Sequence, residues 1–306
     1  MGPDVISSRT NARVKQLRAA FQGHARLSGG LIAIEGDHLL EEALRSGMML
    51  KSVFVCERRE TPKIVPRGVE VVRLTEDVFG SVVETQSPQG VAALLVPPVW
   101  ELDDVMGSGG IAPLILIAVG LQDPGNLGTL VRSAEAFGAT GILTTPGTVS
   151  AWNQKALRAS VGSVFRVPVV GVGASEIEEL KQRGVKLIAA VGSDDVGVVA
   201  AQSMDFMSGC AVMIGNEGSG LAAEWMEKCD ARVTIPCPGP VESLNAAVAG
   251  SLLLYEASRQ RRGEWRKHEQ NAGVLRSAQN DSIGARHGDK KQTTATRAGK
   301  TERETR

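Results

Sequence analysis

Short apolar runs alternate with amphipathic segments along most of the chain. In the first third, apolar residues at helical spacing predict helices over 5–21 and 38–47, and Ser7 and Ser8 are able to cap the first of them. Runs rich in Val, Ile and Leu predict strands around these helices. These strands are expected at 31–36, 52–57, 69–74 and 90–96. The first third therefore predicts a small α/β unit.

A break in the pattern follows this unit. Pro97-Pro98 and the glycine-rich run 106–110, with charged residues between them, are typical of a linker. We therefore predict a first domain over 1–98 and a linker over 99–111.

Beyond the linker the alternation is more regular. The predicted strands are continuous apolar runs, at 113–119, 141–145, 164–170, 185–191, 211–215 and 231–236. The predicted helices lie between and after them, at 126–137, 152–162, 174–183, 221–229 and 243–261. Fully apolar strands separated by amphipathic helices favour a parallel sheet covered on both faces. The sequence thus predicts an α/β domain over 112–264.

The pattern stops at Trp265. Large apolar side chains are scarce from there to the end of the chain, so this segment cannot offset its ordering entropy. We predict a disordered tail over 265–306.

Charge is balanced overall but unevenly distributed. The 306 residues hold 34 Lys and Arg against 34 Asp and Glu, which argues against a protein held to nucleic acid by bulk charge. Residues 99–264 carry 12 basic and 18 acidic side chains, whereas the tail carries 10 and 5. The first 26 residues hold five cations against one acid, Asp4. Basic segments at the two ends can therefore still contact phosphates.

Several protein classes are disfavoured by what the sequence lacks. The longest apolar run, 111–119, has nine residues, against about 18 for a membrane span, and no signal segment is apparent. The four cysteines form no CxxC pair and suit a reducing compartment, so we expect a soluble cytoplasmic protein without a membrane partner. The four histidines show no ligand spacing, and we expect no metal. The absence of GxGxxG and GxxxxGK[ST] disfavours the usual dinucleotide and nucleotide folds.

Three loops stand out because each follows a predicted strand, where open α/β sheets bind their ligands. The first loop, 121–128, reads Leu-Gln-Asp-Pro-Gly-Asn-Leu-Gly and leads into a helix that bears Arg132. Taken alone, Asn126 fits a helix N-cap as well as a functional amide, and Arg132 fits a surface cation as well as a functional one.

The other two loops have similar double interpretations. Loop 215–220 holds three glycines, which allow a close approach to a ligand, and Glu217, which also fits a capping acid. Loop 235–245 is stiffened by three prolines and presents Ser243 and Asn245 at the start of a helix. Together the three loops favour a functional site over three unrelated caps.

The three loops resemble the motifs of the SpoU (TrmH) family of RNA 2′-O-ribose methyltransferases, in the SPOUT superfamily. The motifs correspond, in order and separation, to residues 123–138, 214–221 and 235–261. The first hundred residues resemble the family's small, ribosomal-protein-like substrate-binding domain. That second resemblance rests on residues 7–18, 34–44 and 85–94.

The resemblance implies a fold and a cofactor. It implies an α/β protein whose C-terminal parallel-sheet domain is tied into a trefoil knot and binds S-adenosylmethionine, with RNA and not DNA as the partner. It also implies a homodimer. The positions implied for cofactor binding are Gly192, Ile214, Gly215, Ile235 and Leu244.

The resemblance further implies catalytic roles for Asn126, Arg132, Glu217, Ser243 and Asn245, which fall on the family's conserved polar positions. A guanidinium stays protonated and is a poor base, so Arg132 would hold the phosphate beside the reacting hydroxyl and activate that hydroxyl electrostatically. Asn126 and Asn245 would orient Arg132 and the ribose, while Ser243 and Glu217 would support the pocket.

Substrate and assembly are less determined. The extra first domain, with Arg9, Arg13, Lys15 and Arg18 as RNA contacts, favours ribosomal RNA over tRNA. The alternatives are a tRNA 2′-O-methyltransferase, a non-catalytic RNA-binding protein of the same fold, and a nucleotide-binding α/β enzyme of another chemistry. Spacing does not decide whether the apolar residues of the last helix serve the core or a dimer interface. These residues are Leu244, Val248, Leu252 and Tyr255.

Overall fold

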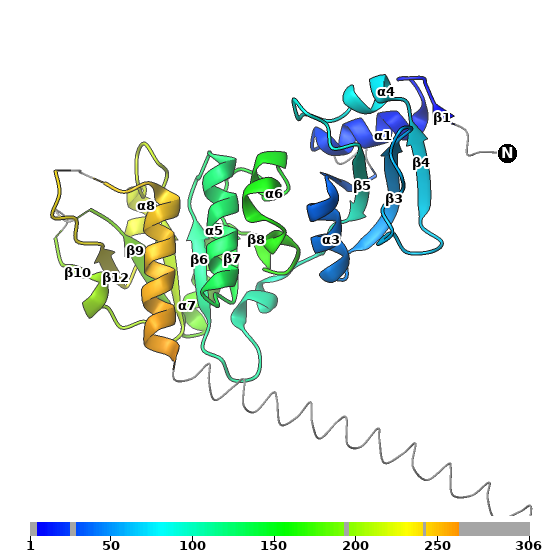
Figure 1. The fold of residues 1–306 in the computed structure, drawn as a ribbon. Coiled ribbons are helices and arrows are strands. Elements are labelled where there is room, and N and C mark those ends of the chain that lie inside the picture. The colour runs from blue at the N-terminus through cyan, green and yellow to red at the C-terminus, as the bar shows by residue number, and fades with distance from the viewer. Residues whose placement is uncertain (1–4, 25–28, 193–195, 241–242, 263–306) are drawn as a thin grey trace, which may run out of the picture. The chain divides into compact units, whose positions relative to one another are not determined.

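A computed structural model describes residues 5–24, 29–192, 196–240 and 243–262 (Figure 1). These residues form two separate sheets with their helices, one from residues before 97 and one from residues after 113. The fold class is therefore α/β, as the apolar pattern predicts.

The first sheet is mixed, with strand order β1-β4-β3-β5-β2. Strands β1, β4 and β3 run parallel to one another, whereas β5 pairs antiparallel with both β3 and β2. The strands are β1 (Val5–Ile6), β2 (Ile32–Glu35), β3 (Met49–Cys56), β4 (Glu70–Leu74) and β5 (Val91–Val96). The helices are α1 (Ala12–Phe21), α3 (Asp37–Arg45) and α4 (Glu76–Gly80).

The first helix begins later than its apolar spacing predicts. Residues 5–6 pair with β4 at the sheet edge, and α1 starts only at Ala12. Asn11 caps α1 by accepting a hydrogen bond from the backbone N–H of Arg13, so the expected caps Ser7 and Ser8 are wrong. Pairing with a strand far along the chain decides the conformation of this segment, and local spacing does not contain that information.

The second sheet is parallel throughout, with order β10-β12-β9-β11-β6-β7-β8, which confirms the predicted parallel sheet. Its strands are β6 (Leu114–Ala118), β7 (Gly141–Thr144), β8 (Val169–Gly171), β9 (Lys186–Ala190), β10 (Val198–Ala200), β11 (Cys210–Ile214) and β12 (Ala231–Thr234). Its α-helices are α5 (Pro124–Ala136), α6 (Gln154–Ser160), α7 (Ala174–Gln182), α8 (Ala223–Met226) and helix 246–262.

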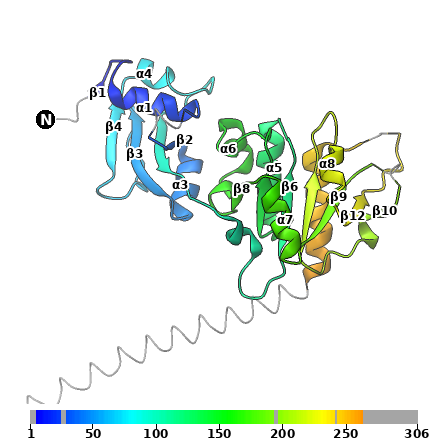
Figure 2. The same ribbon diagram turned by 180° about the vertical axis from the view of Figure 1, so that it is seen from behind.

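Helices cover both faces of this sheet (Figures 1 and 2). On one face, α5 and helix 246–262 pack on the alternate side chains of β6 and β11 that include Leu116 and Ile214. On the other face, α7 and α8 pack on Ile117 and Met213. The two helices of the first face are also joined by a hydrogen bond of 2.7 Å between the hydroxyls of Ser133 and Ser251.

Three predicted elements differ from the observed ones. The predicted strand 164–170 is a 3-10 turn, η2 (Ser163–Phe165), followed by the short β8, because its apolar run marks burial and not an extended backbone. The predicted helix 221–229 is reduced to the one turn of α8. The predicted linker contains a 3-10 helix, η1 (Leu102–Met106), whose Val105 is fully buried.

Two expectations concern residues that the structure does not describe. The trefoil knot depends on how the chain passes from β12 to helix 246–262 through residues 241–242, and these residues and the tail 265–306 lie outside the described ranges. Within those ranges, every helix is too short or too polar to cross a bilayer.

Candidate active site

The first loop places Asn126 at the carboxyl end of β6, inside the first turn of α5. Asp123, and not Asn126, caps this helix, because its Oδ1 accepts the backbone N–H of Asn126 at 2.9 Å. Pro124 occupies the first helical position, where a missing N–H costs nothing. Of the two interpretations of Asn126, the N-cap is therefore wrong, and its side-chain amide is available for other contacts.

Lys155 at the start of α6 fixes Asp123 from the other side, with its Nζ 2.7 Å from Oδ2. The hydrogen bond from Lys155, followed by that from the Asn126 backbone, lowers the pKa of the Asp123 carboxyl. Asp123 thus stays ionised and holds the loop against the helix at neutral pH.

A chain of hydrogen bonds joins all three loops. The Nδ2 of Asn126 donates to Oε1 of Glu217 at 2.8 Å, and the Nδ2 of Asn245 donates to Oδ1 of Asn126 at 3.1 Å. The Oδ1 of Asn245 accepts the backbone N–H groups of Ala247 and Val248, so Asn245 also caps helix 246–262. Residues separated by 91 and 119 positions therefore form one polar array.

The glycine-rich second loop is a tight turn that carries Glu217 into this array. Asn216 and Gly220 exchange backbone hydrogen bonds of 3.0 and 2.9 Å. A Cβ on Gly215 would lie 2.2 Å from the carbonyl carbon of Gly220, so only glycine fits there. The side chain of Asn216 donates to the carbonyl of Gly120 at 2.8 Å and ties this loop to the end of β6.

Two predicted catalytic residues lie outside the array. Arg132 is exposed on α5, and Ser243 is exposed before helix 246–262; neither side chain has a hydrogen-bond partner among the described residues. The structure thus shows no contact through which Asn126 or Asn245 would orient Arg132. The two amides contact each other and Glu217 instead.

The positions predicted for the cofactor lie at the ends of three adjacent strands. Gly192 follows β9, Ile214 and Gly215 end and follow β11, and Ile235 follows β12. Space is open beside Gly192, because no atom of the described residues lies within 4 Å of where its Cβ would stand, whereas the Cβ position of Gly215 is filled by Gly220. Leu244 is half-buried beside Asn245, at the start of the last helix.

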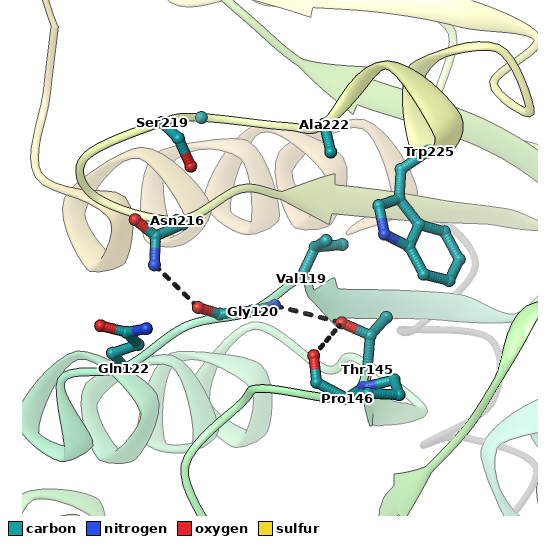
Figure 3. Close-up of a pocket in the computed structure, with 10 residues that line it drawn as sticks. Val119, Gly120, Gln122, Thr145, Pro146, Asn216, Ser219, Ala222 and Trp225 are labelled. Carbon is teal, nitrogen blue, oxygen red and sulfur yellow. Dashed lines mark hydrogen bonds between the residues drawn. The ribbon is translucent and has the colours of Figure 1, made fainter.

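A separate pocket of about 330 Å³ opens beside the array (Figure 3). It lies at the ends of β6, β7 and β11 and is walled on one side by α8. The side chains that line it include Gln122, Thr145, Ser219 and Trp225. Sequence reasoning missed this pocket, since Trp225 looks like one more apolar position of a helix.

The predicted RNA contacts lie on and before α1. Arg9 is 2.5 Å from Asp77 and Arg13 is 2.6 Å from Glu70, so both cations are partly neutralised. Lys15 is exposed, and Arg18 donates to the carbonyl of Arg9. Arg13, Lys15 and Arg18 line a groove of about 680 Å³ along the helix.

Possible metal ligands and the Cys229 thiol are two further candidates for chemistry in the described part of the chain. No three His, Cys, Asp or Glu side chains come together there as a metal site would require. Burial, followed by the charge of Asp230, raises the pKa of the Cys229 thiol to about 11. That thiol is therefore a weak nucleophile at neutral pH.

Comparison with known proteins gives a consistent result. Residues 113–255 match the SpoU rRNA Methylase family, and residues 11–93 match the MRM3-like substrate binding domain. The chain is 36% identical over 251 residues to the 23S rRNA (guanosine(2553)-2′-O)-methyltransferase RlmP of Bacillus subtilis, covering 82% of this chain and 97% of that protein. It is 30% identical to the 23S rRNA (uridine(2479)-2′-O)-methyltransferase of Streptomyces viridochromogenes, covering 84% and 92% of the two chains.

Solved structures agree with these matches. An AdoMet-bound rRNA methyltransferase from Sinorhizobium meliloti superposes with a TM-score of 0.73 and 28% identity, over 84% of this chain and 98% of that one. The AdoMet complex of the SpoU methyltransferase AviRb from Streptomyces viridochromogenes gives a TM-score of 0.72, 28% identity and coverage of 82% and 98%. The resemblance inferred from the three loops is thereby confirmed, and the chain belongs to the SpoU rRNA methylase family, with a substrate-binding domain of the MRM3-like type before its methylase domain.

Proposed function

We propose that this chain transfers a methyl group from S-adenosylmethionine to a ribose 2′-hydroxyl in 23S ribosomal RNA. The observation that carries the proposal is the hydrogen-bonded array of Glu217, Asn126 and Asn245, which gathers the three family motifs at one edge of the parallel sheet. The similar proteins from Bacillus subtilis and Streptomyces viridochromogenes carry 23S rRNA in their names, which favours this RNA over tRNA. For an enzyme acting on this substrate we propose a cytoplasmic location.

We assign the cofactor to the ends of β9, β11 and β12. Gly192, Gly215 and Ile235 would hold it through backbone groups, with Leu244 as an apolar contact. The Ile214 side chain packs in the core under helix 246–262, so Ile214 too would contribute its backbone. Bound there, S-adenosylmethionine would supply a sulfonium methyl group that needs no activation. The remaining task of the protein is to position and activate a weak nucleophile, and positioning alone can contribute about 7–11 kcal/mol.

Arg132 is the residue we assign to activate the hydroxyl. Its guanidinium is exposed and has no ion-pair partner in the described ranges, so it is free to bind an RNA phosphate. Because it stays protonated, it stabilises the developing alkoxide, and a phosphate oxygen or a water accepts the proton. Asn126 and Asn245 would hold the ribose, and Glu217 fixes the Asn126 amide.

The substitution Arg132→Ala tests this assignment. We expect methyl transfer to an unmodified 23S rRNA transcript to fall at least about 100-fold, while calorimetric affinity for S-adenosylmethionine stays unchanged. Arg158→Ala is the matched control, because Arg158 is also exposed, on α6. Full activity of Arg132→Ala would refute the assignment.

Mapping ribose methylation in a strain that lacks this protein tests the choice of RNA. Loss of a methylated ribose in tRNA, with 23S rRNA unchanged, would contradict 23S rRNA as the substrate.

The groove along α1 is the RNA-docking surface we propose for the first domain. Lys15 is its most available cation, since Arg13 pairs with Glu70 and Arg18 donates to the carbonyl of Arg9. Lys15→Ala should weaken RNA binding and reduce the slope of log affinity against log salt by about one. Lys63→Ala, a change at another exposed lysine of this domain, should leave the slope unaltered. Equal slopes for Lys15→Ala and the wild type would contradict this surface.

Helix 246–262 is the dimer interface we propose. Val248, Leu252 and Tyr255 are 47, 42 and 44% exposed and recur every three or four residues, on one face of the helix. The ring of Tyr255 also meets Phe137 of α5 edge-on, at 5.6 Å between centroids. Leu252→Glu should convert a dimer to a monomer in sedimentation equilibrium, and Val99→Glu, at an exposed valine in the predicted linker, should not. A wild-type monomer at micromolar concentration would refute the interface.

A further inference from the structure

The pocket beside the array adjoins the end of β11 but not the ends of β9 and β12, the other two strand ends assigned to the cofactor. Its lining comes from the ends of β6 and β7, the loop after β11, and α8. None of Gly192, Ile235 and Leu244 takes part. It adjoins the array, however, because Asn216 lines the pocket and the next residue, Glu217, binds Asn126.

The chemistry of the lining is neutral. Among the described residues, no carboxylate, ammonium or guanidinium group lines the pocket, so these residues offer nothing to pair with a phosphate or another ion. Its apolar surface comes from Val119, Pro146 and the indole of Trp225. Figure 3 shows the indole beside Val119 on one side of the pocket, with Gln122 and Ser219 facing it from the other side.

The polar groups of the lining divide into fixed and free ones. The Asn216 side chain donates to Gly120 O, and Gly120 N donates to the Thr145 hydroxyl at 3.1 Å, which makes a hydrogen-bonded floor. The side chains of Gln122 and Ser219 have no hydrogen-bond partner among the described residues. The side chains of Gln122 and Ser219 are therefore available to a ligand, whereas those of Asn216 and Thr145 are already engaged in the hydrogen bonds of the floor.

We propose that this pocket binds one nucleobase of the RNA substrate, beside the reacting ribose. A base is a neutral, planar ring system with donors and acceptors on its edge, and single-stranded RNA is recognised by stacking such bases on aromatic side chains. Trp225 supplies the stacking face, and Gln122 and Ser219 bind the edge of the base. About 330 Å³ lies at the small end of ligand pockets, which suits one ring system and not a whole cofactor.

This inference rests on the proposed RNA methylation and is tested by separating RNA affinity from cofactor affinity. The Kd of an unmodified 23S rRNA transcript is measured by filter binding at 150 mM salt, its KM by tritium transfer, and the Kd of S-adenosylmethionine by calorimetry. The variants are Trp225→Ala, which removes the stacking face, and Trp225→Phe, which keeps an aromatic ring. Trp100→Ala removes a tryptophan that does not line the pocket.

We expect Trp225→Ala to raise the Kd and KM for RNA about 5-fold to 150-fold, the range that loss of base–aromatic stacking gives. Trp225→Phe should stay within about threefold of the wild type, and S-adenosylmethionine affinity should not change in any variant. An RNA Kd for Trp225→Ala equal to that of the wild type would overturn the inference. A parallel loss of cofactor affinity would also overturn it, since the pocket would then serve the cofactor or the fold. If the wild type transferred no methyl group, the proposed function would fail, while the filter-binding comparison would still decide the pocket.

Discussion

Helices α5 and α6 meet at Gly128, and this contact allows a quantitative prediction. A Cβ at Gly128 would stand 2.4 Å from the carbonyl oxygen of Ala156 and 2.7 Å from the Cβ of Ala159. Ordinary contacts of a Cβ begin at 3.4 Å, so Gly128→Ala must push a helix backbone aside and not merely turn a flexible side chain. Overpacking of this kind costs about 1–3 kcal/mol.

Helix propensity offsets part of this cost. Alanine is favoured over glycine inside a helix by about 0.5–1 kcal/mol. The expected net loss in the free energy of unfolding is therefore about 1–2 kcal/mol, which corresponds to a fall in Tm of about 2–8 °C. Because α5 also carries Asn126, a displacement of this helix should reduce methyl transfer by up to about 100-fold.

Thermal unfolding and methyl transfer are measured on Gly128→Ala and on a matched variant, Gly80→Ala. Gly80 is also helical, at the end of α4, but no atom of the residues that the structure describes lies within 4 Å of where its Cβ would stand. Gly80→Ala should therefore keep or slightly raise the Tm. If Gly128→Ala melted at the same temperature as Gly80→Ala, the close approach of the two helices would be refuted.

Three further predictions follow from single contacts. Asp123→Ala should cost about 1 kcal/mol of stability as a lost N-cap, and Asp123→Asn, which keeps the cap, less. Because the pKa of Asp123 is lowered in the folded state, its ion-pair contribution to stability is full above the unfolded value of about 3.9 and is lost as the pH falls through the lower folded-state value. The Tm difference between wild type and Asp123→Asn should therefore shrink from pH 7 to 3, and a constant difference would contradict this. Because the pKa of the Cys229 thiol is raised to about 11, Cys229 should resist iodoacetamide at pH 8 and react progressively faster towards pH 11. Labelling is followed by peptide mass spectrometry, and rapid labelling at pH 8 would contradict the burial of this thiol. Glu35 is 8% exposed, and its carboxylate accepts hydrogen bonds from the Thr85 hydroxyl at 2.8 Å and from the Gln89 N–H at 2.9 Å. Glu35→Ala should therefore lower the free energy of unfolding by about 1–3 kcal/mol and hasten proteolysis of loop 84–90, whereas Glu35→Gln should lower it less. Cleavage of Glu35→Ala at the wild-type rate would contradict this prediction.

The sequence is a good guide to where the site lies and a poor guide to which atoms meet there. The three loops could be placed because apolar runs predict parallel strands, and ligands bind at the carboxyl ends of such strands. The partners of Asn126 could not be predicted, because Glu217 and Asn245 lie 91 and 119 residues away and no local pattern encodes that pairing.

The N-cap of α5 shows that the sequence also leaves the choice between neighbouring residues open. Asp123 and Asn126 are both good N-cap residues, and only Pro124, which favours the first helical position, points to Asp123. The sequence does not indicate that Trp225 lines a pocket, since an aromatic residue in a predicted helix is expected in the core. Its position on a one-turn helix beside the pocket follows from the early end of α8, which spacing did not predict.

The reach of the Asn126 contacts has a consequence for synthesis of the protein. Asn126 and the strand before it emerge from the ribosome long before Asn245, yet among the described residues the donor to the side-chain Oδ1 of Asn126 comes from Asn245. A nascent or truncated chain that ends before residue 243 therefore retains two of the three motifs with the polar array incomplete. The complete array can therefore form only after almost the whole described chain has been made.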